Sequence, residues 1–293
     1  MLLALAASTP VTFTWGAPQT FDTALPVAKG EFVFREQLMY AEATDDPTAA
    51  DRDVQVFGAV SALGFGVTPR VALFAVLPYL DKQLEVTTGP ARRATRGASG
   101  IGDLRLFARY TVVQNDGPGR TFRIAPVFGF EVPTGGDDER DRLGVLPQPL
   151  QPGSGSLDPF AGVVLTYQTL TYQVDAQFGY EHNAEANGFE FGDVLRLDAS
   201  LQYRLWPREL SAGVPGFVYA VIEANLAERD ANTLNGVEDP NSGGTTFHLS
   251  PGLQYVTKRW IVEGIVQIPV TQELGGDALE EDFTVRVGFR FNF

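Results

Sequence analysis

The C-terminal stretch 283–293, FTVRVGFRFNF, constrains the fold more than any other part of the chain. Apolar side chains occupy every second position from Phe283 to Phe293, and Thr, Arg, Gly and Asn fill the positions between them. Because successive side chains of a strand point to opposite faces, the pattern predicts a strand with one apolar and one polar face. In a soluble sandwich the apolar face would pack on a second sheet. Here it continues to the terminal residue, where soluble chains usually become polar, so we favour a different environment.

The polar face of this strand carries Arg286 and Arg290, which suit a hydrated interior. A C-terminal strand that alternates aromatic residues and ends in Phe resembles those of bacterial outer-membrane β-barrels, in which the terminal Phe is an assembly signal. The resemblance implies that Phe293 is such a signal and that the barrel-assembly machinery is a partner of this chain.

Composition agrees with a barrel and excludes several other classes. No apolar run of about 18 residues occurs, so the sequence offers no transmembrane helix. The mean hydropathy is close to zero, as expected when outward apolar and inward polar residues cancel. The lack of cysteine excludes disulfides and thiolate metal sites, and the net charge of -14 argues against a nucleic-acid partner.

The N-terminal part of the chain shows no strand pattern. Residues 1–7, MLLALAA, resemble the end of a signal-peptide apolar region that lacks its basic start, although an ordinary disordered terminus is the alternative. Residues 9–28 are rich in Pro and Thr without a steady period. We therefore interpret 1–28 as a signal-peptide remnant and periplasmic lead-in, and 29–293 as a single outer-membrane barrel.

Further two-faced segments follow along the chain, and the clearest are 103–113, 172–180 and 195–205. Together they give about twelve strands, with long connections mostly after odd-numbered strands and short ones after even-numbered strands. This pattern predicts an all-β fold, a transmembrane antiparallel up-and-down β-barrel. We expect a Gly- and Arg-rich loop at 88–100 and a long extracellular loop at 134–157.

Short motifs spread over most of the mature chain form an ordered set. They are FGVTPR at 65–70 followed by LPY at 77–79, GIGDLRLFARY at 100–110, VPTG at 132–135, GSGSLD at 153–158, GY at 179–180 and GD at 192–193. In this order they resemble the bacterial family called MetA-pathway of phenol degradation. The resemblance implies an outer-membrane barrel that passes small, often aromatic, compounds, and it transfers no catalytic or binding residue to this chain.

Charged residues of both signs are expected to point into the lumen. These pore-lining candidates are Arg105, Arg109, Arg123, Glu131, Asp175, Arg196, Asp198, Arg204, Glu223, Glu263, Arg286 and Arg290. They could line a hydrated pore and set its selectivity, or pair off and fill the interior as structural cross-links. If a pore exists, the excess of arginine predicts a preference for anions or polar aromatic compounds.

The remaining candidates for chemistry are weak. His248 lies two residues from Ser250, which suggests a hydrolase, but residues two apart on one strand are poorly placed for the hydrogen bond of a catalytic pair. His182 is expected to be solvated at the rim. Acidic clusters at 45–46, 137–139 and 280–282 follow no known calcium-loop spacing and are expected to be solvated loops. We therefore expect no catalytic residue, metal or cofactor.

The sequence thus predicts a passive channel or transporter for small molecules in a Gram-negative outer membrane, and not an enzyme. Its expected partners are outer-membrane lipid, lipopolysaccharide and the solute; Arg92, Arg93 and Arg96 are candidate contacts to lipopolysaccharide phosphates. A structural or surface-contact barrel with a plugged lumen is the first alternative. An outer-membrane lipid-modifying enzyme is the second.

Overall fold

The computed structural model describes residues 18–89, 92–209 and 215–293. The wall strands are β1 (Phe32–Ala43), β2 (Asp53–Gly66), β3 (Val71–Gly89), β4 (Arg92–Ile101), β5 (Leu104–Tyr110), β6 (Val113–Gly117), β7 (Arg120–Val132), β10 (Asp158–Thr169), β11 (Tyr172–Glu181), β13 (Val194–Trp206), β14 (Phe217–Arg229), β17 (Gly244–Val256), β18 (Trp260–Leu274) and β19 (Phe283–Asn292). The long connections carry β8 (Arg140–Asp141), β9 (Gly144–Val145), the short 3₁₀ helix η1 (Gln148–Leu150), β12 (Phe189–Glu190), β15 (Thr233–Leu234) and β16 (Val237–Glu238).

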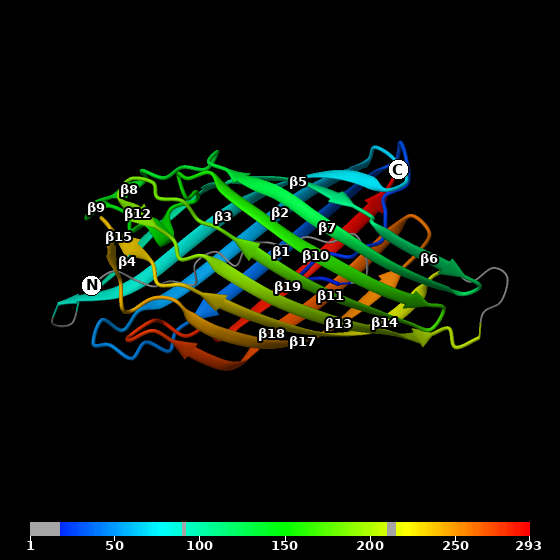
Figure 1. Cartoon of the computed structure of the whole chain (residues 1–293). Coiled ribbons are helices and arrows are strands. Elements are labelled where there is room, and N and C mark those ends of the chain that lie inside the picture. Colours follow the sequence, from blue (N-terminus) through cyan, green and yellow to red (C-terminus); the bar gives the residue numbers. More distant parts are fainter. Residues whose placement is uncertain (1–17, 90–91, 210–214) are drawn as a thin grey trace.

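The wall closes on itself, because β1 pairs with both β2 and β19 and β7 pairs with β10. β4, β5 and β6 follow one another along a single wall position, so the barrel has 12 strands, all antiparallel. Closure leaves no unpaired sheet edge facing lipid, which is the requirement for a spanning sheet. The predicted all-β up-and-down barrel is confirmed (Figure 1).

The two ends of the barrel differ. Figure 1 shows β8, β9, β12 and β15 gathered at one end, where the long connections lie. We call this end the mouth and the opposite, short-turn end the base; in barrels of this type the long loops are extracellular and the short turns periplasmic. Among the described residues, no helix has the length and apolarity needed to cross a membrane.

The final strand β19 has the two faces that its sequence predicts. Arg286 and Arg290 point inward and are 5% and 2% exposed, whereas Val287 and Phe289 point outward and are 53% and 42% exposed. The same alternation runs around the wall and leaves large apolar side chains on its outer surface. A closed antiparallel barrel with an apolar outer belt and a polar interior spans an outer membrane.

The prediction of a loop at 88–100 is wrong for most of these residues, because they form a hairpin. β3 continues to Gly89 and pairs with β4 in register through Leu84 and Arg96. Both faces of β4 are exposed or half-exposed, so this hairpin extends beyond the belt and needs no apolar alternation. Such a strand cannot be predicted from alternation of apolar and polar residues.

Pro78 lies where the partner of β3 changes. β5 pairs with β3 as far as Val76, and β4 begins pairing at Tyr79, with Gly102 and Asp103 between the two segments. Proline has no backbone N–H, so it fits a position where the ladder is interrupted. The carbonyl of Pro78 accepts a hydrogen bond from Gly102 N at 2.8 Å.

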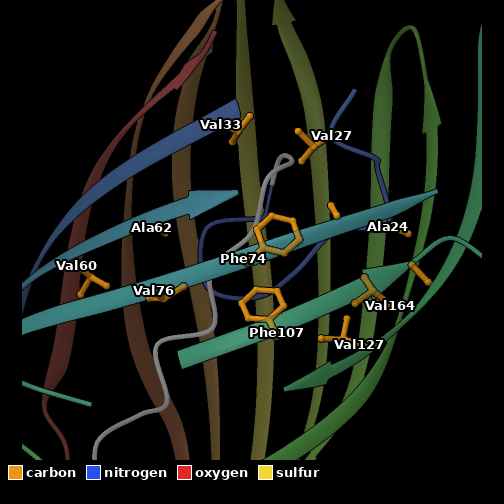
Figure 2. Close-up of a cluster of buried hydrophobic side chains, with 12 residues drawn as sticks. Ala24, Val27, Val33, Val60, Ala62, Phe74, Val76, Phe107, Val127 and Val164 are labelled. Carbon is orange, nitrogen blue, oxygen red and sulfur yellow. The ribbon is translucent and has the colours of Figure 1, made fainter. Parts of the chain in front are cut away.

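Residues 18–24 do not lie below the barrel. Residues 18–24 are buried in the barrel interior, although the sequence suggested a periplasmic lead-in for 9–28. Figure 2 shows Ala24 and Val27 among side chains that point inward from several wall strands. The interpretation of residues 1–17 as a signal-peptide remnant falls outside the described residues.

The contacts where β1 pairs with β19, which we call the seam, allow a test of whether the ring of Phe293 stabilises the closed barrel. Phe293 exchanges two backbone hydrogen bonds with Phe32, at 2.8 and 2.9 Å, and its ring centroid lies 5.6 Å from that of Phe32 and 5.9 Å from that of Phe291. Phe293→Ala keeps the backbone bonds and removes the ring contacts. We expect it to lower the free energy of unfolding by about 1 kcal/mol.

Urea titration of the refolded protein in lipid vesicles, followed by tryptophan fluorescence, measures this change. Phe293→Tyr keeps the ring and is the matched control. Equal unfolding midpoints for the Ala variant, the Tyr variant and the parent chain would show that the terminal ring does not stabilise the seam.

Candidate lumen and its chamber

The lumen is filled in its middle by the N-terminal segment, residues 18–27, which we call the inner segment. Glu223, on the inward face of β14, accepts hydrogen bonds from the backbone N–H groups of Gln19 at 2.6 Å and Thr20 at 3.0 Å. The same carboxylate accepts a bond from the Thr20 hydroxyl, whose oxygen in turn accepts one from Asn225 Nδ2 at 2.8 Å. The inner segment is therefore held by specific side chains of the wall.

A second group of contacts crosses the seam between β18, β19 and β1. Glu263 pairs with Arg35 at 2.7 Å and with Arg290 at 2.6 Å, and the side chains of Arg35 and Glu263 are fully buried. The two arginines also donate to inner-segment carbonyls, Arg35 to that of Gln19 and Arg290 to that of Pro18. A buried carboxylate is tolerated when it is paired and hydrogen-bonded in this way.

The opposite wall holds the inner segment through β5, β10 and β11. Arg109 donates to the carbonyls of Thr23 and Leu25, both at 2.6 Å. The hydroxyl of Thr23 lies 2.9 Å from that of Thr166 and 3.1 Å from Asp175 Oδ1. The segment has no secondary structure of its own, so wall residues distant in sequence supply hydrogen bonds to many of its polar groups, although Gln19 Oε1 is buried without a partner among the described residues.

Part of this wall is apolar instead of polar. Ala24 and Val27 pack in a cluster of inward-facing side chains that includes Phe74, Phe107 and Val164 (Figure 2). The inner segment therefore covers an apolar patch with its own apolar side chains and presents its polar groups to the charged side of the lumen.

Above the inner segment, towards the mouth, lies a chamber with an empty volume of about 1390 Å³, counting its opening. Its walls differ in chemistry. One side is apolar and consists of Met39, Ala41, Ala43, Val54, Val56, Val76, Pro78 and Leu80. The charged lining groups are Glu42 of β1 and Lys82 of β3, beside the apolar residues, and Asp103, Arg105, Glu131, Asp158, Glu181 and Glu281 from other parts of the wall and mouth.

The long connection 133–157 folds into the mouth and narrows the chamber. Lys82 Nζ donates to the carbonyls of Pro149 at 3.1 Å and Gln151 at 2.7 Å. Leu146 and Leu150 pack with inward-facing residues of the wall and with Leu279 from the last loop. The loop is therefore anchored by both a buried cation and an apolar cluster.

The predicted pore-lining residues separate into four groups along the lumen. Arg109, Asp175, Glu223, Glu263 and Arg290 hold the inner segment; Arg105 and Glu131 line the chamber; Arg196, Asp198 and Arg286 line a side cavity; Arg123 and Arg204 lie near the base. Most of these charges are engaged: Arg105, for example, pairs with Glu131 at 2.6 Å and Glu181 at 2.8 Å. Counting inward arginines is thus a poor measure of selectivity.

Sequence reasoning missed three functional parts of the lumen. Lys82 and Arg35 occupy inward positions of β3 and β1, and the alternation of those strands could have identified them. The inner segment has no period, and only its run of Gln and Thr hydrogen-bonding groups hinted at a polar environment.

The histidines do not form a nucleophile–base pair in the described contacts. His248 Nε2 lies 3.0 Å from Glu281 Oε2, whereas Ser250 donates to Asn225 at 3.4 Å. His182 is exposed at the rim, as expected, and its ring nitrogen lies 3.0 Å from both oxygens of Asp193. The hydrogen bond and the charge of Asp193 raise the pKa of His182 above its usual value.

The acidic clusters are partly engaged within the protein: Glu281 contacts His248, Asp282 accepts a bond from Thr44, and Asp137 accepts one from Asn187. Asp46 pairs with Arg52 at 2.6 Å. Although burial opposes the shift, the bonds from Arg52 and Thr48 lower the pKa of Asp46 to about 2. Arg93 of β4 pairs with Asp51 and with Asp53 at the start of β2, so it is engaged within the protein. Within the described residues no group of three or more carboxylate or imidazole side chains is arranged to hold a metal ion.

The contacts of Arg109 allow a test of the inner segment. Arg109→Ala removes two hydrogen bonds to the segment's backbone, each worth about 1.5–3 kcal/mol because the donor is charged. We expect the segment to loosen, so single-channel conductance in planar bilayers should rise or become noisier than that of the parent chain.

Arg123→Ala is the matched control, since Arg123 is an arginine of the adjacent wall that pairs with Asp116 at the base. It should leave the conductance unchanged. If Arg109→Ala and Arg123→Ala both behave like the parent chain, the segment does not limit ion flow.

Comparisons with known proteins place this fold in a family. The sequence matches the model of the family described as MetA-pathway of phenol degradation over residues 44–273. No curated protein matches the sequence.

Solved structures with a similar fold include an outer membrane channel of Pseudomonas putida F1, with 12% identity, a TM-score of 0.70, and coverage of 92% of this chain and 98% of that one. The β domain of the Bordetella autotransporter BrkA has 12% identity, a TM-score of 0.48, and coverage of 90% and 100%. Because the family match covers most of the barrel, the chain belongs to the MetA-pathway of phenol degradation family.

Proposed function

We propose that this protein is a passive outer-membrane channel for small molecules with an apolar, for example aromatic, body. The observation that carries the proposal is the chamber inside the mouth, which offers an apolar wall and a charged wall to the same solute. Sites for small organic molecules combine apolar lining with a few polar groups in this way. The family's description and the channel from Pseudomonas putida F1 support the same class of function.

Passage requires a path beyond the inner segment. Eight-stranded barrels are filled by side chains and sixteen-stranded barrels hold aqueous channels, so a 12-stranded barrel has an intermediate lumen. Here chain segments occupy part of that lumen. The flux of solute would therefore depend on how far the inner segment moves aside. The solute would move down its concentration gradient.

A plugged barrel is the second candidate, because the inner segment fills the middle of the lumen and the loop 133–157 narrows the mouth. In that case the loops would carry the function. The two candidates differ in one observable, which is whether solute crosses the membrane.

Uptake of benzenesulfonate, an aromatic solute whose charge keeps it from crossing lipid alone, into vesicles that contain the refolded protein tests the proposal, with a variant that fills the chamber. Ala41 lies on an inward position of β1 and lines the chamber, so Ala41→Trp should reduce protein-dependent uptake severalfold by steric block.

Leu38→Trp is the control, because Leu38 is 48% exposed on the outer face of the same strand and does not line the chamber. It should leave uptake unchanged. Vesicles with folded protein that take up no more benzenesulfonate than empty vesicles would favour the plugged barrel. Equal uptake by the two Trp variants would show that the chamber is not on the path.

A further inference from the structure

Two arginines near the mouth lie on the inward faces of adjacent strands. Arg196 of β13 is opposite Ala227, and Arg229 of β14 is opposite Val194. Arg196 and Arg229 are thus diagonal neighbours on one face, a spacing of roughly 7–8 Å that long side chains can bridge. An anionic group between them could contact both guanidinium groups.

These two arginines differ from the engaged arginines of the lumen. Nε and Nη2 of Arg196 and Nε of Arg229 are buried and have no hydrogen-bond partner among the described residues, and the same holds for Nε of Arg204 near the base. Arg105, in contrast, has carboxylate partners and Arg109 has carbonyl partners. A buried guanidinium nitrogen without a partner is costly, so an acceptor brought there by a ligand would be bound favourably.

The two arginines share a side cavity with an empty volume of about 460 Å³, counting space that is open to solvent. Its other ionisable lining groups are Arg286, His248, Asp198 and Glu281. Glu281 is hydrogen-bonded to His248, and Asp198 accepts a bond from Asn225 at 2.9 Å through Oδ1, while its Oδ2 is buried without a partner among the described residues. With His248 neutral, the arginines exceed the carboxylates by one charge, which matches a monoanion better than a dianion.

The side cavity adjoins the chamber, because Glu281 and Thr284 line both. Arg196 also lines a second, smaller cavity that shares Arg105, Glu181 and Val194 with the chamber. The chamber and the arginines are therefore neighbours, which is the arrangement that a ligand with an apolar body and an anionic group needs.

We propose that Arg196 and Arg229 bind the carboxylate of small aromatic acids as these enter the chamber. This inference rests on the proposed channel function and specifies its solute class. The planar guanidinium group matches the two oxygens of a carboxylate, and the apolar chamber wall receives the ring. The site makes the mouth selective for organic monoanions over neutral molecules of the same shape.

Isothermal titration calorimetry of the folded protein in detergent tests the site with benzoate, and with benzyl alcohol as the neutral counterpart. Benzoate should bind more tightly than benzyl alcohol. Arg196→Gln and Arg229→Gln should each weaken benzoate binding about tenfold, the effect of losing one charge-assisted hydrogen bond, and leave benzyl alcohol unchanged. Arg196→Lys should recover part of the loss.

Arg204→Gln is the matched control, because Arg204 lies inward on the same strand near the base, where it donates to the carbonyl of Arg208 and is absent from these cavities. It should bind benzoate like the parent chain. The proposed carboxylate site would be contradicted by equal affinity for benzoate and benzyl alcohol. It would also be contradicted if the Arg196→Gln and Arg229→Gln variants bind benzoate like the parent chain. Conductance of the parent chain, measured separately, reports on the channel itself, so a conducting protein without benzoate preference contradicts only the site.

Discussion

The buried carboxylate of Glu263 and its two arginine partners connect the main features of this structure. Arg35 comes from the first wall strand and Arg290 from the last, so the ion pairs cross the closing seam of the barrel. The same two guanidinium groups reach the carbonyls of Pro18 and Gln19. Pairing and hydrogen bonding stabilise charges inside a low-dielectric barrel, so wall closure and the position of the inner segment depend on one network.

This network helps to explain how the interior of a barrel of intermediate width is filled. The wall alone would enclose more space than its side chains fill. The inner segment occupies the middle, the loop 133–157 enters the mouth, and the amphipathic chamber remains between them. Charges at the segment are mostly satisfied by protein groups, whereas the arginines of the side cavity keep unpaired nitrogens.

The sequence predicted the wall well because membrane and lumen impose a strict alternation on each strand. The arginines and aromatic residues of β19 lie on the faces that the pattern assigns to them. The alternation ends where both faces meet water, so β4 was expected to be a loop. Residues 18–27 bind wall residues more than a hundred positions away, such as Glu223 and Thr166, and no local pattern encodes such contacts. The inward direction of the twelve candidate residues could be predicted, but their pairing depends on the register between strands.

The central claim is that the inner segment lies inside the barrel, and a cross-link measures this directly. The hydroxyl oxygens of Thr23 and Thr166 are 2.9 Å apart, and the chain contains no cysteine. In the folded double variant Thr23→Cys with Thr166→Cys, mild oxidation should form a disulfide that mass spectrometry detects in high yield. The pair Thr23→Cys with Thr169→Cys, three residues further along β10, should not cross-link. Failure of the first pair to cross-link, or equal yields for both pairs, would contradict the account.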